Sequence, residues 1–330
     1  MMVTDTARAV ALRILGGLAT PDAPLGPLTT YRLGGPAALL VKPTTVADLV
    51  LVGEAREASG LPVLVVGRGS NMLVADEGFP GIAIWVPSLV ADLEMSDAAG
   101  GTVAARAGGG MVLPVVARRL AGRAMRGFEW AVGVPGSIGG AVRMNAGGHG
   151  SDMAACLVEA DVFNLATGTS ASHPVDSLGL RFRSSALSDD QIVVSATLRV
   201  EPGDRAAAEA ELAEIVHWRR ENQPGGQNAG SVFVNPIPGE VSAGTLIDQL
   251  GLRGFRVGSA CVSDKHANFI QGSDGGSAAD VRSVMEHVRA KVAADTGFQL
   301  RSEVRLVGFE APIIDSGIDS VTDSVTGDGE

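Results

Sequence analysis

A glycine-rich stretch constrains the fold and function of this chain more than any other feature. Residues 132–150 read VGVPGSIGGAVRMNAGGHG, with seven glycines among nineteen residues and no lysine, aspartate or glutamate. Glycine loses more conformational entropy on folding than other residues, so a loop that only connects two elements gains nothing from so many of them. A backbone without side chains does let a ligand approach closely. We therefore interpret the stretch as one wall of a cradle for a phosphate group or a ring.

A second glycine turn, GRGSNM at residues 67–72, has the features of a phosphate site. Its glycines permit positive φ and close approach, while backbone N–H groups and the side chains of Ser70 and Asn71 can hydrogen-bond phosphate oxygens. A tight turn with capped polar groups explains the composition equally well. Two cradles on one chain suit a long ligand with a diphosphate in its middle.

The elements around the second turn argue against a dinucleotide-binding βαβ fold. The pattern predicts a strand at 38–42, a helix at 44–60 and a buried strand at 61–67. The third glycine of a G-x-G-x-x-G fingerprint is missing, because Met72 stands in its place, and the following VADEGFPGIAIWV returns to a strand. No helix is therefore expected whose N-terminus could receive a pyrophosphate.

The rest of the chain mixes strands and helices and predicts an α+β fold. Strands are expected at LVEADVFN and QIVVSATLRV, and helices at LPVVARRLAGRAM, 204–223, AGTLIDQLG and from Ser277 onward. In FQLRSEVRLVG, period-2 alternation puts Leu300 and Val304 on one face and Glu303 on the other. Residues 311–330 carry five acids and no base, which is typical of a disordered tail.

Composition excludes several function classes. A net charge of −11 argues against a general nucleic-acid binder, since neutralising phosphates requires a basic surface. No apolar run is long enough to span a bilayer and the first residues lack a secretion signal, so a cytoplasmic protein is expected. Cys156 and Cys261 lack a zinc-like spacing and are expected as buried thiols rather than a disulfide or a metal site. Nothing in the sequence indicates a bound metal or an obligate protein partner.

Three further segments carry polar residues that could do chemistry: FRSS with Arg183, SVFVNP with Ser231 and LRSEVR with Glu303. Taken alone, each has a simpler interpretation. Arg183 fits a surface ion pair, and Ser231 fits a turn hydroxyl because no G-x-S-x-G elbow surrounds it. Glu303 fits a solvated carboxylate between two arginines. The residues alone leave these alternatives open.

Taken in order, the segments resemble the UDP-N-acetylenolpyruvoylglucosamine reductase family, flavoenzymes that complete UDP-N-acetylmuramate in bacterial cell-wall synthesis. The resemblance rests on TTYRLGGPA, VGRGSNMLV, GFEWAVGVPGSIGGAVRMNAG, FRSS, AGSVFVNP, AGTLIDQLGLRG, VSDKHANFI and LRSEVRLVG, which extend over most of the chain. It implies an FAD-binding domain of the vanillyl-alcohol-oxidase (PCMH) type in two subdomains, residues 1–90 and 91–203. A substrate-binding α+β domain at 204–310 would follow.

The resemblance also assigns roles to residues. It implies non-covalent FAD contacts at Tyr31, Arg32, Gly67, Gly69, Ser70, Asn71, Met72, Gly133, Val134, Pro135, Ser137, Gly139 and Gly140. It implies catalytic roles for Arg183, Ser231 and Glu303. Substrate contacts are implied at Asn235, His266 and Asn268. NADPH is the implied hydride donor, and the enolpyruvyl ether of UDP-N-acetylglucosamine is the implied substrate.

In the implied mechanism NADPH reduces the flavin, whose N5 then passes a hydride to C3 of the enolpyruvyl group. Negative charge spreads from C2 into the carboxylate, where Arg183 and a protonated or hydrogen-bonded Glu303 stabilise it. Ser231 then protonates C2 as a general acid. A serine hydroxyl is a weak acid, but the carbanionic intermediate is a strong base.

The chain departs from the family pattern at three places. Tyr31 is its only tyrosine, so it resembles a shorter subgroup that lacks the tyrosine-bearing insertion closing over the substrate. Val234 stands where many relatives have a lysine, so Lys265 or an arginine must meet part of the diphosphate charge. His149 replaces a commoner tyrosine. The alternatives are another FAD-dependent oxidase or dehydrogenase of the same superfamily and a nucleotide-binding module without enzymatic activity.

Overall fold

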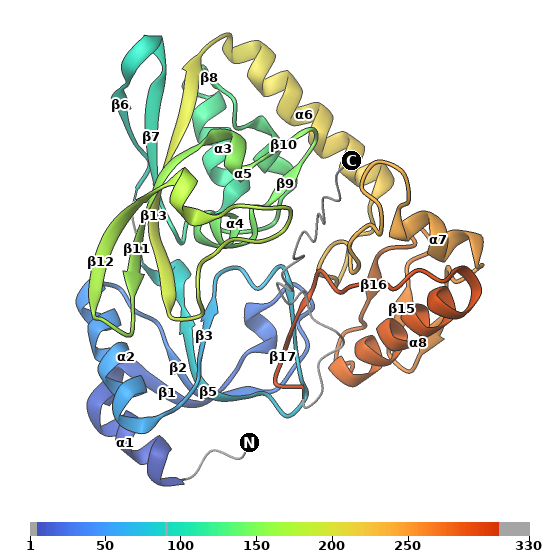
Figure 1. Cartoon of the computed structure of the whole chain (residues 1–330), viewed down its shortest axis with the longest axis horizontal. Coiled ribbons are helices and arrows are strands. Elements are labelled where there is room, and N and C mark those ends of the chain that lie inside the picture. Colours follow the sequence, from blue (N-terminus) through green and yellow to red (C-terminus); the bar gives the residue numbers. More distant parts are fainter. Residues whose placement is uncertain (1–4, 90–91, 310–330) are drawn as a thin grey trace, which may run out of the picture.

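Figure 1 shows the computed structural model of the chain, of which residues 5–89 and 92–309 are described. The N-terminal part (blue) lies against the central part (green and yellow), and the C-terminal part (orange to red) lies beside both. The acidic tail expected at 311–330 lies outside the described residues, and so does the boundary expected between residues 90 and 91. The expected domain boundaries stay predictions.

The N-terminal part is a four-stranded sheet with two helices. Its elements are β1 (Ala19–Pro24), β2 (Pro36–Val41), β3 (Val63–Val66), β5 (Phe79–Trp85), α1 (Asp5–Leu15) and α2 (Val46–Ser59). The strand order is β1-β2-β5-β3, in which β1 is antiparallel to β2 and the other neighbours are parallel. The expected strand, helix and strand over 38–67 are therefore confirmed within a few residues at each end.

Local signals in the sequence set the ends of α2. The Thr45 side chain accepts a hydrogen bond from Asp48 N, and the Asp48 side chain accepts one from Thr45 N, so the two residues form a capping box. The helix ends at Gly60, whose φ of 68° suits glycine. After the GRGSNM turn the chain forms β4 (Met72–Val74) and then β5, with no helix between them. This order confirms that the unit is not a dinucleotide-binding βαβ fold.

The central part is built on an antiparallel sheet. Its strands are β6 (Glu94–Asp97), β7 (Val103–Gly108), β8 (Met125–Arg126), β11 (Leu157–Asn164), β12 (Thr169–Pro174) and β13 (Gln191–Pro202). The order is β12-β11-β13-β7-β6, and β8 pairs with the end of β13. The strands expected at LVEADVFN and QIVVSATLRV are confirmed. The edge strands β6 and β12 carry mostly exposed side chains, so the sequence has no alternation of apolar residues that would predict them.

The helices of the central part are α3 (Leu113–Ala121), α4 (Ile138–Met144) and α5 (Met153–Cys156), and a short hairpin joins β9 (Gly147–Gly148) to β10 (Ser151–Asp152). Helix α3 ends sooner than expected, because Ala124 adopts φ 58° and the chain turns into β8. Helix α4 begins inside the glycine-rich stretch, where the Ser137 side chain accepts a hydrogen bond from Gly140 N at 3.3 Å. The stretch is therefore a turn followed by a helix.

Helix α6 (Arg205–Asn222) leads into the C-terminal part, which contains α7 (Ala243–Gln249), α8 (Ala278–Thr296), β14 (Arg256–Val257), β15 (Ala260–Val262) and β16 (Ile270–Gln271). The apolar stripe of α8 is fully buried: Val281, Val284, Met285, Val288 and Val292. The last strand, β17 (Arg305–Val307), leaves this part and pairs in parallel with β4. Only the last residues of FQLRSEVRLVG form this strand. Among the residues before it, Ser302 forms an isolated antiparallel bridge with Phe233.

Neither a membrane span nor a metal cluster occurs among the described residues. None of their helices is long and apolar enough to cross a membrane, and no group of His, Cys, Asp or Glu side chains is placed to hold a metal ion. Both cysteines are free. Cys156 is buried as expected, and burial raises the pKa of its thiol to about 12. Cys261 is partly exposed, because it is the outward-facing middle residue of β15.

Candidate active site

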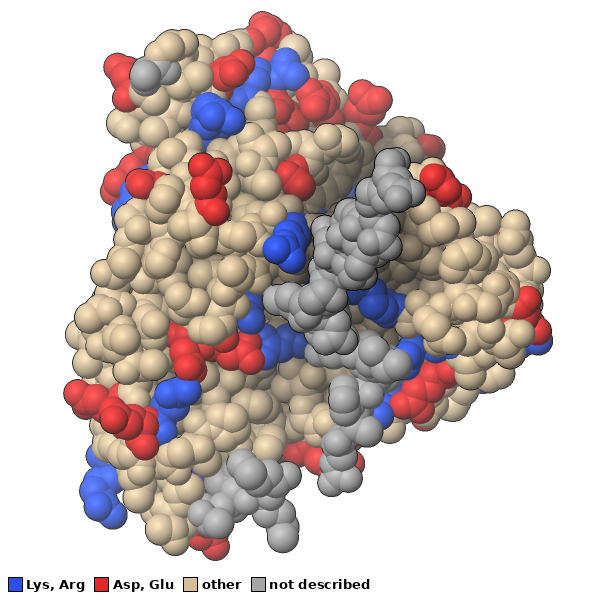
Figure 2. All heavy atoms as spheres, viewed as in Figure 1, with Lys and Arg blue, Asp and Glu red and all other residues tan. Residues whose placement is uncertain are grey.

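A cavity of about 560 Å³ lies where the three parts of the chain meet. It is lined by the two glycine turns, the FRSS loop, the end of α6 and the segments that carry Ser231 and Glu303. Figure 2 shows basic side chains gathered along the hollow in the middle of this face. A smaller cavity of about 80 Å³ adjoins it at Arg143 and Arg305, and an open groove of about 690 Å³ adjoins it at Gly67 and Arg68.

The two glycine turns form opposite walls of the main cavity and nearly touch. A Cβ atom on Gly67 would lie 2.5 Å from Ser137 Oγ, and one on Gly69 would lie 2.4 Å from Leu28 O. Gly69 also has φ 57°, a conformation that other residues adopt with strain. Glycine at position 67 therefore lets the two turns approach this closely, and glycine at position 69 lets the GRGSNM turn pack against Leu28.

The pairing of β17 with β4 brings the segment around Arg305 to the GRGSNM turn. Arg305 lies opposite Met72, and its N–H donates to Asn71 O at 3.0 Å. The Asn71 side-chain amide donates to Glu303 O, also at 3.0 Å. Glu303 and Arg305 are two residues apart in an extended chain, so their side chains lie on the same side and both line the cavity.

Ser231 lies near Glu303 because their two segments are hydrogen-bonded. Glu303 N donates to Val232 O at 2.8 Å, and Val234 N donates to Arg301 O at 3.0 Å. These two bonds place two of the expected catalytic residues on adjacent extended segments that face one cavity. The register of the two segments therefore fixes the position of Ser231 relative to Glu303.

Asn268 holds the other edge of the Ser231 segment. Its carbonyl oxygen accepts from Val232 N at 2.8 Å. Its side-chain oxygen accepts from Phe233 N at 3.0 Å, and its side-chain amide donates to Phe233 O at 2.8 Å. The Asn268 side chain is buried, and it makes the hydrogen bonds to Phe233 that the backbone of a neighbouring strand would otherwise make. The segment that carries Ser231 is thus held on both edges.

Arg183 and Glu303 form an ion pair inside the cavity. Arg183 Nε lies 2.8 Å from Glu303 Oε1, and the two side chains are 28% and 15% exposed, so neither is a solvated surface group. Arg183 Nη1 donates to Gly147 O at 3.1 Å, whereas the buried Nε makes no aligned hydrogen bond among the described residues. Burial raises the pKa of the Glu303 carboxyl, and the attraction of Arg183 opposes this shift without reversing it.

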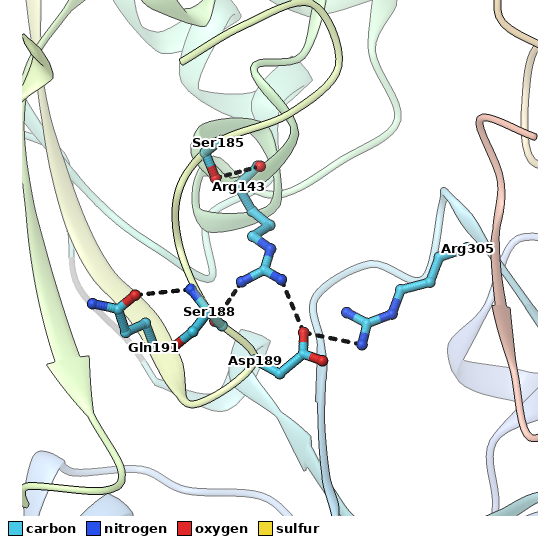
Figure 3. Close-up of polar contacts among 6 residues, drawn as sticks. All are labelled: Arg143, Ser185, Ser188, Asp189, Gln191 and Arg305. Carbon is cyan, nitrogen blue, oxygen red and sulfur yellow. Dashed lines mark hydrogen bonds and ion pairs between the residues drawn. The ribbon is translucent and has the colours of Figure 1, made fainter. Parts of the chain in front are cut away.

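A second group of charges joins the glycine-rich helix to β17. In Figure 3, Arg143 and Arg305 converge on the carboxylate of Asp189, at 2.9 Å and 3.1 Å. Arg143 also donates to Ser188 O, and its own carbonyl accepts from Ser185 Oγ in the FRSS loop at 2.7 Å. The loop that carries Arg183 is thus docked on α4.

Arginine dominates the charge of the main cavity. Its lining contains one carboxylate, Glu303, and the arginines Arg68, Arg143, Arg183, Arg219 and Arg305. Arg143 and Arg219 are partly buried, and this burial lowers the pKa of both groups. Desolvated cations in excess of anions favour an anionic ligand such as a diphosphate or a carboxylate.

Most of the residues expected to contact FAD line these cavities. The main cavity is lined by Gly67, Gly69, Ser70, Asn71, Met72, Val134, Pro135, Ser137 and Gly140. Arg32 lines the open groove, and Gly139 lines the small cavity. Tyr31 and Gly133 line none of the three. Tyr31 is fully buried, with its hydroxyl donating to Ile270 O at 3.0 Å, and Gly133 packs against Arg219.

The expected substrate contacts do not line the cavity, and they stay predictions. The Asn235 side-chain oxygen accepts from Ala243 N at 3.1 Å and so supports the start of α7. His266 Nδ1 accepts from Asn268 N at 3.2 Å, and burial lowers the pKa of His266. Lys265, a candidate for the missing lysine charge, donates to Arg220 O and lies outside the cavity lining.

The sequence did not single out several side chains that line the cavities: Arg143, Asp189, Trp218, Arg219 and Gln223. Arg143 is the only arginine in the glycine-rich stretch, which was a usable signal. Arg219 and Gln223 are four residues apart and share one face of the end of α6. In the sequence they resemble the polar end of any helix. Only the fold shows that this end lies at the cavity.

Comparisons with known proteins agree with this geometry. Residues 222–307 match the family model for the C-terminal domain of UDP-N-acetylenolpyruvoylglucosamine reductase, and residues 37–172 match the model for an FAD binding domain. The UDP-N-acetylenolpyruvoylglucosamine reductase of Heliobacterium modesticaldum is 41% identical over 89% of this chain and 92% of that protein. The one from Synechococcus sp. strain WH7803 is 40% identical over 94% of this chain and 100% of that protein. The crystal structure of the Thermus caldophilus reductase superposes with a TM-score of 0.72 at 32% identity, covering 87% of this chain and 98% of that one.

Proposed function

Because the chain belongs to the UDP-N-acetylenolpyruvoylglucosamine reductase family, we propose that its main cavity brings FAD together with the enolpyruvyl ether of UDP-N-acetylglucosamine. The protein is a flavoprotein reductase of peptidoglycan precursor synthesis, built from an FAD-binding domain of the vanillyl-alcohol-oxidase type and the family's C-terminal domain. NADPH is the proposed hydride source. Both nucleotide substrates are intracellular metabolites, so we also propose that the protein acts in the cytoplasm.

The residues present fit FAD. The two glycine turns line the cavity with little side-chain bulk, and Arg143 and Arg305 supply cations beside them. These features suit the diphosphate in the middle of the cofactor. When bound, FAD carries the hydride between NADPH and the enolpyruvyl group.

Arg183 and Glu303 are placed to stabilise the charge that develops on the substrate carboxylate. Arg183 Nε is buried and makes no aligned hydrogen bond among the described residues, so its N–H can donate one to a carboxylate oxygen of the substrate. The raised pKa of Glu303 extends its protonated form to higher pH, and in that form it donates a hydrogen bond to a second oxygen. Two donors fixed before the reaction lower the cost of forming the charge.

Ser231 is the proposed general acid that protonates C2. Its Oγ belongs to a segment held on both edges, and it faces the same cavity as the Arg183–Glu303 pair. The observation that carries the proposal is this meeting of Arg183, Ser231 and Glu303. Three motifs far apart in the sequence each bring one of these residues to a single cavity.

The test separates the two half-reactions. In Ser231→Ala, reduction of the flavin by NADPH should keep its normal rate, whereas reoxidation by the enolpyruvyl sugar nucleotide should slow by roughly 10²- to 10⁴-fold, the usual contribution of a general acid. Ser283→Ala is a matched control, because Ser283 is on α8 and outside the cavity lining. Equal slowing of both half-reactions would refute the role proposed for Ser231.

A further inference from the structure

The FRSS loop that carries Arg183 is a tight hairpin with a strained backbone. Arg181 N donates to Ser184 O at 3.0 Å, and Ser184 N donates to Arg181 O at 3.1 Å. Between them Arg183 adopts φ 56°, a left-handed conformation that costs free energy in a residue such as arginine. Such strain persists only where the surrounding structure holds the backbone in place. The position of the Arg183 guanidinium therefore depends on the residues that anchor this loop.

Asn145, at the end of α4, is a buried anchor of the FRSS loop. It is 6% exposed and lies outside the lining of the main cavity. Its Nδ2 donates to Arg181 O at 3.2 Å and to Asp152 Oδ2 at 3.2 Å. Its Oδ1 accepts from Ala154 N at 2.9 Å. The donor and the acceptor of the amide are both engaged, which fixes its orientation.

The same side chain supports the group that receives a hydrogen bond from Arg183. Arg183 Nη1 donates to Gly147 O at 3.1 Å. Gly147 is the first residue of β9 and pairs with Asp152 of β10. A Cβ on Gly147 would lie 2.6 Å from Asp152 Cβ, so the two strands are tightly packed at this point. Through Asp152, Asn145 therefore braces the acceptor of the Arg183 guanidinium, and through Arg181 it braces the backbone that carries Arg183.

Asparagine meets both the backbone and the side-chain requirements at position 145. Asn145 ends α4 at φ 39° and ψ 55°, a left-handed conformation that asparagine adopts more readily than most other residues with a side chain. Glycine would keep this backbone and lose the amide. Aspartate would keep an acceptor for Ala154 N, but it has no donor for Arg181 O and would place a second carboxylate beside Asp152.

We propose that Asn145 is a positioning residue for Arg183, which aims the guanidinium at the substrate carboxylate by holding the FRSS loop and Gly147 O in register. The inference rests on the role proposed above for Arg183. Ser185 provides a second anchor, because its Oγ donates to Arg143 O. Loss of the Asn145 amide should therefore loosen the FRSS loop without releasing it from α4.

The experiment follows both half-reactions of Asn145→Gly by stopped flow. The limiting rate of reoxidation by the enolpyruvyl substrate should fall roughly 10- to 10²-fold, because a small misplacement of a catalytic group is costly. The substrate concentration that gives half of this rate should change little, since Asn145 does not line the cavity. Reduction by NADPH and the flavin released on denaturation should match the parent protein.

Two further variants make the result specific to the amide. Asn145→Asp keeps the bond from Ala154 N and should slow reoxidation at least as much as Asn145→Gly, because the donor to Arg181 O is lost. It gives the same comparison if Asn145→Gly does not fold. Asn164→Gly is the matched control, since it removes a side-chain acceptor of Ala166 N in an exposed turn and should leave both half-reactions unchanged.

An Arg183→Ala background separates this inference from the role proposed for Arg183. There Asn145→Gly should slow reoxidation little further, because the group that Asn145 positions is absent. Parental reoxidation in folded Asn145→Gly and Asn145→Asp, or full additional slowing in the Arg183→Ala background, would overturn the inference. Equal slowing of both half-reactions would also overturn it, since it would show a general structural role. If Arg183→Ala alone reoxidises at the parental rate, the role proposed for Arg183 is itself wrong.

Discussion

Asn268→Ala is the substitution that most sharply tests how Ser231 is positioned. It removes the side-chain bonds to Phe233 N and Phe233 O, and it leaves the bond from Val232 N to the backbone carbonyl of residue 268. Phe233 is buried, so its N–H and C=O lose their partners where water is scarce. Each buried group left without a partner costs about 1–3 kcal/mol. The free energy of unfolding should therefore fall by about 2–6 kcal/mol.

The effect on catalysis should be confined to one half-reaction. If the segment that carries Ser231 is loosened, the Ser231 hydroxyl moves away from C2 of the substrate. A misplacement of about 1 Å can slow a reaction roughly 10²-fold. Stopped-flow measurements below the melting temperature should show reoxidation by the enolpyruvyl substrate slowed by about that factor. Reduction by NADPH and FAD content should be unchanged, because Asn268 is outside the lining of the cavity that the glycine turns form.

Two comparisons make the test specific. Asn164→Ala removes a side-chain bond to Ala166 N in an exposed turn far from the cavity, so it should cost no more than about 1 kcal/mol and should not affect reoxidation. In a Ser231→Ala background, Asn268→Ala should slow reoxidation little further, because the group that it positions is absent. Reoxidation at the parental rate in folded Asn268→Ala protein would refute the reasoning.

Two other predictions concern charge. Arg143→Met should raise the Kd for FAD about tenfold, because a charge-assisted contact is lost. Arg118→Met, which changes an exposed residue of α3, should leave this Kd unchanged. Equal Kd values for the two variants in a fluorescence titration would exclude Arg143 from the cofactor site. The folded-state pKa of Glu303 is raised above its unfolded value of about 4.3, so the stability that it contributes is complete below that pH and is lost as the pH rises toward the folded pKa. The stability of the parent relative to Glu303→Gln should therefore fall as the pH is raised from about 4 toward 8, and a difference that stays constant in thermal melts over this range would contradict the shift.

The sequence anticipated the parts of the site that depend on local patterns. The glycine spacing indicated two close-approach turns, and they do face each other at Gly67 and Ser137. Period-2 alternation placed Glu303 on the face opposite Leu300 and Val304, but it could not show that Arg183 covers that face. The coverage comes from residues more than a hundred positions away.

What the sequence missed depends on how distant segments dock. The sequence did not indicate that the amide of Asn268 serves Phe233, 35 residues away, and its expected contact with the substrate stays a prediction. Arg143 and Arg305 meet at Asp189 only after β17 crosses to β4. Trp218 and Arg219 look like surface residues of a polar helix until the end of that helix reaches the cavity. Such contacts carry no local periodicity that a single sequence can reveal.

The central claim is that FAD in this cavity takes a hydride from NADPH and gives it to the enolpyruvyl sugar nucleotide, while an exchangeable proton enters at C2. The direct test reduces the purified protein with NADPH under anaerobic conditions in D₂O and then adds the enolpyruvyl substrate. We predict flavin bleaching, then recovery of its absorbance, and a product with one deuterium at C2 and one at C3, because the N5–H of a reduced flavin exchanges with D₂O before the substrate is added. Failure of the substrate to reoxidise the flavin, or a product without deuterium at C2, would contradict this mechanism.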